Sequence, residues 1–213
     1  GSFPVKSRPS AANSPRSDAT TCVHVAAAKN IRGVAARRLD VVDIRESTNI
    51  TGVFIAELQS HGDSRGRFAE LYRKEWFPQC SWENLQWSRS ESQKGTLRGL
   101  HYHQQQVDYW HCGMGLMRVG LLDLRRGSPT RGQAEVIDLD QQALRGIFIP
   151  MGVAHGFYAV TDLMLLYLVN QYYDGSDEFG LAWDDPDAGL DWGVEGKLII
   201  SDRDRQNPQM RDI

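Results

Sequence analysis

The sequence predicts an all-β domain that folds as a sandwich or a barrel. Three observations predict this class: the apolar runs are short, several of them alternate with polar residues, and long helical patterns are scarce. Segments rich in Gly, Pro, Asp and Ser separate the runs, as tight turns between strands require. The runs interpreted as strands are residues 52–58, 67–73, 115–125, 134–140, 146–150, 156–160 and 163–173.

These elements follow one another in a regular order of strand and turn. The first two predicted strands, GVFIAEL and RFAELYR, flank the turn signal HGDSRG, and the segment RKEWFPQC has the length of one or two helical turns. GLMRVGLLDLR and AEVIDLD then flank RRGSPTRG, and the turn PMG follows GIFIP. GFYAV and LMLLYLVNQYY complete the set, before the turn signals YDGSDEFG and WDDPDAG. A barrel of this size can hold one small ligand among its inward side chains.

The composition fits one domain with a full-sized core and an extension before it. Of the 213 residues, 41% are hydrophobic and 24% are charged, which suffices for a single core. We expect this domain at residues 41–213. Residues 1–40 are rich in Ser, Pro, Ala and basic residues, so we expect a loosely ordered N-terminal extension. An organelle transit peptide is the alternative, because the segment is Arg-rich and poor in acidic residues.

Charge and cysteine content argue against several classes of protein. The net charge of −3 gives no electrostatic reason to expect binding to nucleic acid or to an anionic membrane. No apolar run approaches the roughly 20 residues of a membrane helix. The cysteines, Cys22, Cys80 and Cys112, are odd in number and irregularly spaced, so a disulfide framework or a thiolate zinc site is not expected. We therefore predict a reducing, cytoplasmic setting.

The segment TLRGLHYHQQQVDYWHC at residues 96–112 gathers the side chains most suited to chemistry. His101 and His103 are two positions apart, so in a strand they share one face, and Gly99 permits a bulge that re-aims a neighbouring side chain. His155 follows the Pro-x-Gly turn of IPMGVAHGF. The pattern HxH…PxGxxH resembles the cupin jelly roll, a double-stranded β-helix with few short helices, in which two adjacent strands aim imidazoles into one barrel.

Six segments in order extend this resemblance to one family. HGDSRGRFAELYR, GTLRGLHYH, DLRRGSPTRG, IPMGVAHGF, YLVNQYY and SDRD are similar to motifs of the dTDP-4-dehydrorhamnose 3,5-epimerase family of sugar-nucleotide epimerases, over about residues 42–208. The resemblance implies an isomerase of deoxysugar biosynthesis that acts on a dTDP-linked 4-keto-6-deoxyhexose without cofactor or metal. It also implies a homodimer, because in this family the segment around Arg65 often reaches into the neighbouring subunit.

The resemblance assigns the catalytic roles to three residues. His101 matches the family's base, Asp204 matches the carboxylate that orients this base, and Tyr167 matches the general acid. The C4 ketone of the sugar acidifies the protons on C3 and C5, so a base can remove one and leave an enolate, which an acid then protonates from the opposite face. An imidazole suits the base because it titrates near working pH, and a carboxylate partner favours its protonated form.

Further residues match positions that bind the substrate in this family. Arg65 and Arg98 match residues that hold the diphosphate, for which a planar guanidinium is well shaped. Glu70 and Gln86 match residues near the base and the sugar of the nucleotide substrate. Ser88 stands where many relatives carry Asn, and His155 matches a further active-site histidine. His111 is expected to be a strand residue with satisfied hydrogen bonds, and Tyr172 and Tyr173 are expected to pack the barrel rim.

Two departures from the family pattern leave alternatives open. His103 stands where the family usually has Gln, and Asp108 falls where it has a lysine that stabilises the enolate. A carboxylate would repel that charge, so a non-catalytic homologue that only binds the sugar nucleotide is one alternative. The other is a metal-binding cupin with different chemistry, because His101, His103, Asp108 and His155 together resemble the ligand set of such proteins.

Overall fold

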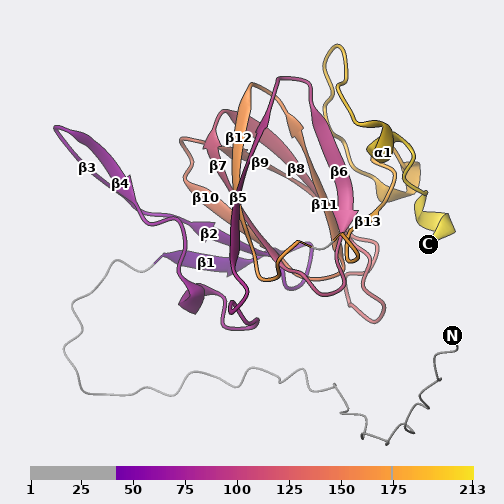
Figure 1. Ribbon diagram of the computed structural model, residues 1–213, viewed down its shortest axis with the longest axis horizontal. Helices are drawn as coiled ribbons and strands as arrows, with labels where there is room; N and C mark the ends of the chain where they lie inside the picture. The colour runs from indigo at the N-terminus through magenta and orange to yellow at the C-terminus, as the bar shows by residue number, and fades with distance from the viewer. Residues whose placement is uncertain (1–41, 174) are drawn as a thin grey trace, which may run out of the picture. The chain divides into compact units, whose positions relative to one another are not determined.

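The computed structural model describes residues 42–173 and 175–213. Its two large antiparallel sheets enclose a core, as Figure 1 shows, and the predicted all-β jelly roll is confirmed. The predicted extension, residues 1–40, lies outside the described residues. In the part of the chain described, no helix is long and apolar enough to cross a membrane.

Six strands form the first sheet and five form the second. In spatial order, the first sheet contains β1 (Asp43–Glu46), β2 (Phe54–Glu57), β10 (Arg145–Ile149), β7 (Asp108–Met114), β12 (Leu163–Val169) and β5 (Gln86–Ser92). The second contains β13 (Phe179–Gly180), β6 (Leu97–Tyr102), β11 (Val153–Ala159), β8 (Leu116–Asp123) and β9 (Ala134–Asp140). Neighbours in both sheets are mostly distant in sequence, because the chain crosses repeatedly from one sheet to the other.

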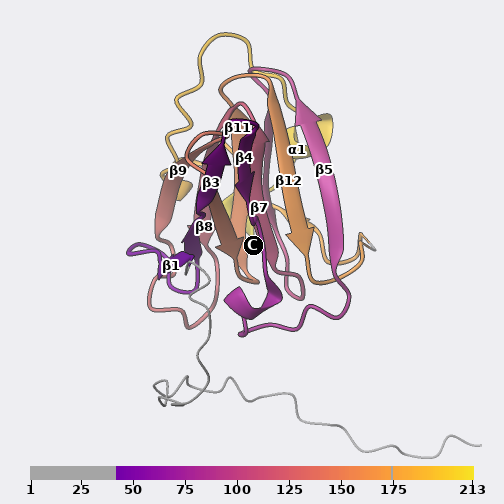
Figure 2. The same cartoon turned by 90° about the vertical axis from the view of Figure 1, so that its left-hand side faces the viewer.

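Short elements complete the fold. β3 (Ser60–Asp63) and β4 (Gly66–Ala69) form a separate hairpin, which projects from the sheets in Figure 1 and points toward the viewer in Figure 2. The helical elements are one turn each: α1 (Asp202–Arg205) and the 3₁₀ turns Lys74–Trp76, Pro186–Ala188 and Met210–Asp212. The predicted strand at residues 67–73 is therefore wrong in its second half, where the chain leaves the hairpin and enters the first 3₁₀ turn.

The main core lies between the inner faces of the two sheets. Trp110 on β7 and Leu165 on β12 pack there in one cluster with Val119 on β8 and Phe157 on β11. Trp110 and Phe157 meet edge to face, with ring centroids 5.9 Å apart, a favourable arrangement for aromatic rings. Burial of these apolar side chains is the main force that holds the sheets face to face.

A second cluster attaches the C-terminal segment, residues 181–213, to the second sheet. Trp192 packs with Leu122 and Tyr158 on that sheet, and its indole N–H donates to the Trp183 carbonyl at 2.7 Å. A side chain at Gly120 would have no space, because a Cβ there would lie 2.5 Å from the Trp192 ring. This packing matters for the site, because the same segment carries Asp204.

A buried carboxylate fixes the turn after β8. Asp123 accepts hydrogen bonds from the guanidinium of Arg125 and from the hydroxyls of Ser128 and Thr130. Burial opposes ionisation of Asp123, but these hydrogen bonds outweigh it and hold the pKa of the carboxyl well below its usual range. Asp123 therefore stays charged and paired, and the motif DLRRGSPTRG has a structural role in this chain.

Candidate active site

A cavity of about 260 Å³ opens between the two sheets. Strand β6 and β11 supply one wall, and β5, β7 and β12 supply the other. Most of the residues predicted to form the site line it: Gln86, Arg98, His101, His103, Asp108, His155 and Tyr167. Alternation along each strand turns these polar side chains inward, so the barrel has a polar pocket beside an apolar core.

His101 and Asp204 form a hydrogen-bonded dyad at this cavity. The Nε2 atom of His101 lies 2.8 Å from Oδ1 of Asp204, whose side chain is only 6% exposed. Asp204 also accepts from the Gly99 amide at 3.4 Å and sits in α1, where Ser201 caps the Asp204 amide. Burial opposes its ionisation, but the His101 contact prevails and lowers the pKa of Asp204.

The dyad fixes which nitrogen of His101 can act as a base. An ionised carboxylate only accepts hydrogen bonds, so Nε2 carries the proton and Nδ1 carries the lone pair of the neutral ring. Nδ1 lies 3.8 Å from Oε1 of Glu178, a residue of the cavity wall. The basic nitrogen of His101 is therefore Nδ1.

Glu178 is a site residue that sequence reasoning did not find. Its segment, DGSDEFG, looked like a turn and nothing more, but β13 pairs with β6 at His101 and brings Glu178 beside the imidazole. Glu178 also contacts Arg203 at 2.9 Å and the Tyr173 hydroxyl at 3.2 Å. Burial opposes ionisation of Glu178, yet the hydrogen bond from Arg203 helps to lower its pKa. Tyr173, which we expected to pack the rim, lines the cavity as well.

Tyr167 faces the cavity from the sheet opposite His101. It lies on β12, next to Trp110 of β7 and Ser88 of β5 in the register. Ser88 itself does not line the cavity, although it accepts a hydrogen bond at 3.1 Å from Gln86, which does. The two-residue repeat of β5 places Ser90 in the wall, so sequence reasoning chose the right strand but missed this serine.

His103, Asp108 and His155 form a second polar group in the same cavity. Oδ2 of Asp108 lies 4.0 Å from Nε2 of His103 and 3.9 Å from Nε2 of His155. All three side chains are almost fully buried. Burial lowers the pKa of His155 to about 4, although Asp108 acts in the opposite direction, so this ring is neutral at neutral pH. Asp108 thus faces the cavity that His101 and Tyr167 line.

Comparison with known proteins assigns this architecture. The model of the dTDP-4-dehydrorhamnose 3,5-epimerase family matches residues 47–212. The chain belongs to this epimerase family. Similar proteins include the spore coat polysaccharide biosynthesis protein SpsL of Bacillus subtilis, 37% identical over 68% of this chain and 98% of that protein. The dTDP-4-dehydrorhamnose 3,5-epimerase of Methanothermobacter thermautotrophicus is 34% identical over 78% of this chain and 93% of its own length.

Solved structures of epimerases have the same fold. The dTDP-6-deoxy-D-glucose-3,5-epimerase of Legionella pneumophila, in complex with dTDP-4-keto-L-rhamnose, superposes with a TM-score of 0.75 at 30% identity. The match covers 80% of this chain and 94% of that one. A 3'-monoepimerase from Streptomyces bikiniensis, in complex with dTDP-quinovose, gives a TM-score of 0.74 at 30% identity and covers 78% of this chain and 88% of its own. The relatives of this epimerase family member therefore include epimerases named for two positions of the sugar, 3 and 5, and an epimerase named for position 3 alone.

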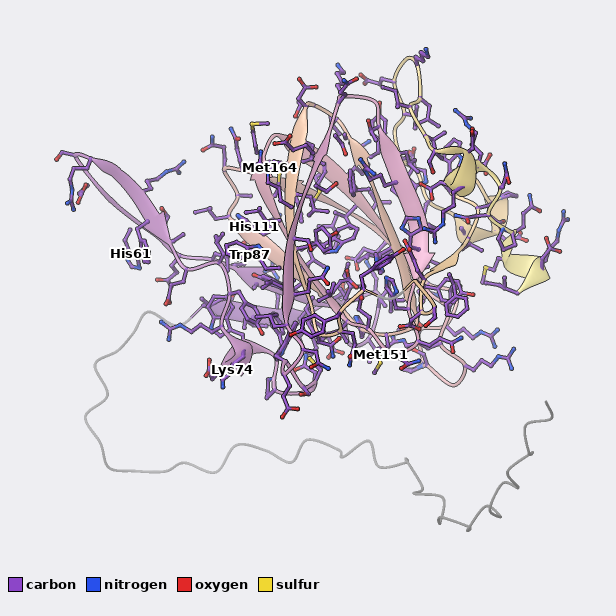
Figure 3. All side chains as sticks on the ribbon, viewed as in Figure 1. His61, Lys74, Trp87, His111, Met151 and Met164 are labelled. Carbon is purple, nitrogen blue, oxygen red and sulfur yellow. The ribbon has the colours of Figure 1, made fainter. Side chains whose placement is uncertain are left out.

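Two predicted residues lie away from the cavity of this epimerase family member. Arg65 is at the turn of the β3–β4 hairpin, where its side chain is 88% exposed and pairs with Asp63 at 2.5 Å. Glu70 follows the hairpin and pairs with Arg73. Figure 3 shows His61 of the same hairpin at a distance from the barrel. Within one chain, the structure therefore does not bring Arg65 and Glu70 to His101.

Proposed function

We propose that the protein epimerises a dTDP-linked 4-keto-6-deoxyhexose at C3, at C5 or at both, by proton transfer through an enolate. One observation carries this proposal: the His101–Asp204 hydrogen bond of 2.8 Å leaves a basic nitrogen at a polar cavity that Tyr167 also lines. A proton acceptor and a proton donor on opposite walls are what inversion of a carbon requires. General acid–base catalysis of this kind contributes about 10²–10⁴-fold to a rate.

In the proposed reaction His101 removes the proton next to the C4 ketone. The electron pair of the C–H bond moves into the enolate, and Asp204 stabilises the imidazolium that forms because it stays ionised beside Nε2. Tyr167 then donates its phenolic proton to the other face of the same carbon. A phenol has an ordinary pKa of about 10, which suffices to protonate a strongly basic enolate carbon.

The size of the cavity suggests how the substrate is divided. About 260 Å³ is less than the roughly 300–1,000 Å³ of pockets that enclose a whole drug-sized ligand. The sugar ring would occupy the cavity, and the nucleotide would lie at its open mouth. Arg98 is exposed and lines the cavity as well. Its guanidinium donates to the Ser92 hydroxyl and the Glu91 carbonyl and has further N–H groups for the diphosphate.

Deuterium exchange tests the proposed reaction directly. In D₂O, the purified protein is expected to replace the proton at C3, at C5 or at both in dTDP-4-keto-6-deoxyglucose, because the phenolic hydrogen that Tyr167 donates to the enolate has exchanged with the solvent. Proton NMR reports the two carbons separately and so distinguishes a single from a double epimerase. Binding of the sugar nucleotide without exchange at either carbon would contradict the proposal and support a non-catalytic homologue.

A homodimer would supply the residues that the cavity lacks in one chain. The projecting hairpin with the exposed Arg65 supports a dimer in which Arg65 reaches the diphosphate in the partner's site. Loss of a charge-assisted contact costs about 1.5–3 kcal/mol, so the Arg65→Ala homodimer is expected to have a KM raised by about 10- to 100-fold.

Mixed dimers make this test specific. The mixed dimer contains one Arg65→Ala chain and one His101→Asn chain, co-expressed with two different tags. If the hairpin of each chain completes the site of the other, the site with the native His101 also receives the native Arg65. The mixed dimer is then expected to show the KM of the unchanged protein and about half of its turnover. A KM as high as that of the Arg65→Ala homodimer, or a chain that sediments as a monomer, would contradict the exchange.

The cytoplasmic setting also remains a proposal. Cys80 and Cys112 are free thiols in the part of the chain described, which fits a compartment in which thiols stay reduced. Burial raises the pKa of both thiols to about 11, so neither is a reactive thiolate at neutral pH.

A further inference from the structure

Three buried side chains in the cavity place their ligating atoms around one point. His103 follows β6, Asp108 begins β7 and His155 lies on β11, so three segments contribute. One ligand atom from each lies within 4.8 Å of the other two. Among residues 42–173 and 175–213, they are the only group of three or more His, Cys, Asp or Glu side chains with this property.

Hydrogen bonds on the far side of each imidazole decide which nitrogen faces the group. Nδ1 of His103 donates to the Asp177 carbonyl at 2.6 Å, and Nδ1 of His155 donates to the Val153 carbonyl at 2.9 Å. A carbonyl oxygen only accepts, so Nδ1 carries the hydrogen in both rings. In each neutral ring Nε2 therefore presents its lone pair to Asp108.

Asp108 is held by donors of its own. Gln106 donates to Oδ2 at 3.1 Å, and the Trp110 indole N–H donates to Oδ1 at 3.2 Å. All three side chains thus have partners that fix their orientation from outside the group. Metal-binding histidines and carboxylates are held by outer partners in this way.

The spacing of the three atoms suits a metal ion better than a shared proton. The 3.9 and 4.0 Å separations from Asp108 to the two Nε2 atoms exceed the roughly 3.2 Å limit of a hydrogen bond. Ligand atoms bound at about 2.0–2.2 Å in a tetrahedral site lie roughly 3.3–3.6 Å apart, so the three atoms need to approach one another by only about half an ångström to bind an ion. A buried charge is usually paired or bound to a metal ion, and a cation among these three side chains would offset the burial of the Asp108 carboxylate.

We propose that His103, Asp108 and His155 bind a divalent first-row transition-metal ion. Two imidazoles and one carboxylate suit Mn²⁺, Fe²⁺, Co²⁺, Ni²⁺ or Zn²⁺ rather than Ca²⁺ or Mg²⁺. Three protein ligands leave coordination positions open toward the cavity. His101 is not part of this close group of ligand atoms, and its Nε2 bonds to Asp204. The ion and the proposed base can therefore be present together, and the metal site does not depend on the proposed sugar chemistry.

Co²⁺ is a suitable probe because its visible absorption reports coordination. Protein without a His tag is freed of metal with a chelator, dialysed and titrated with Co²⁺. We expect one equivalent to bind per chain with visible d–d bands, an increase in Tm, and displacement by Zn²⁺. Asp108→Asn and, separately, His103→Gln are expected to weaken binding by at least about 100-fold, since loss of an outer partner alone costs about 10- to 100-fold.

His111→Gln is the matched control. His111 is also a buried histidine, on the same strand as Asp108, and its Nδ1 also bonds a backbone carbonyl, that of Arg145 at 2.9 Å. This variant is expected to bind Co²⁺ like the unchanged protein. The proposal would be overturned if Asp108→Asn and His103→Gln, each checked for folding by circular dichroism, bound Co²⁺ as tightly as the unchanged protein. It would also be overturned if the unchanged protein bound no stoichiometric Co²⁺. Since neither measurement uses a substrate, both are independent of the deuterium exchange test.

Discussion

The His101→Asn variant is expected to lose turnover by about 10²–10⁴-fold, the contribution of a general base, without loss of the fold. His101 is 23% exposed at the side chain and belongs to neither apolar cluster, so its removal opens no cavity in the core. Asparagine keeps an N–H donor near Asp204, which avoids an unpaired buried carboxylate. Only the basic nitrogen at the cavity is lost.

Deuterium exchange at C3 and C5 measures this loss, and circular dichroism checks the fold. His111→Asn is the control, because it removes a histidine that does not line the cavity. Asp204→Asn should also lower turnover, since the amide cannot stabilise the imidazolium as a carboxylate does. A His101→Asn variant that exchanges at the native rate would show that another group removes the proton.

The Gly156→Ala variant is expected to lose about 3 kcal/mol of unfolding free energy, the upper end for overpacking. Gly156 lies on β11 at the irregular pairing with β6, between His155 and Phe157. A Cβ there would lie 2.5 Å from the Arg98 carbonyl oxygen and 3.1 Å from Cα of Gly99. Backbone atoms cannot rotate away as a side chain does, so β6 and β11 would have to separate.

This separation should also affect catalysis, because β6 carries His101. A displacement of about 1 Å can cost about 10²-fold in rate, so turnover of Gly156→Ala is expected to fall together with stability. Gly62→Ala is the control: Gly62 is exposed on the hairpin, and a Cβ there would be 3.5 Å from Cγ of Arg67, an ordinary contact. The unfolding free energy of Gly62→Ala should stay within about 0.5 kcal/mol of that of the unchanged protein. Urea unfolding compares the two, and equal midpoints would contradict the close packing of β6 on β11.

The sequence predicts most of the strands that bury apolar side chains, but it misses β7, which is almost wholly buried, and β5, which is not. β5 was not predicted because its inward residues, Gln86, Ser88, Ser90 and Ser92, are polar. Gln86 and Ser90 line a polar cavity rather than the core, so the apolar alternation that identifies a strand is absent from β5. The feature that hides this strand is therefore the same one that makes it part of the site.

The candidate site was predictable where a motif carried it. Cavity-lining positions were inferred for His101, His155 and Tyr167 from motif order, and they line the cavity. The position of Glu178 at the cavity was not inferred, because it depends on a two-residue strand, β13, that no local pattern predicts. Arg65 stays a prediction, since its proposed contact would be made in another chain.

The hydrogen bond between His101 and Asp204 joins residues 103 positions apart in the chain. Such a contact closes a long loop, which costs chain entropy that only the surrounding packing can offset. Folds rich in contacts of this kind form slowly, in about milliseconds to seconds. A partly folded chain with the barrel strands in place but Trp192 not yet docked over Gly120 would hold the imidazole without its acid partner. Proton exchange therefore requires the C-terminal segment to be docked as well as the barrel strands to be in place.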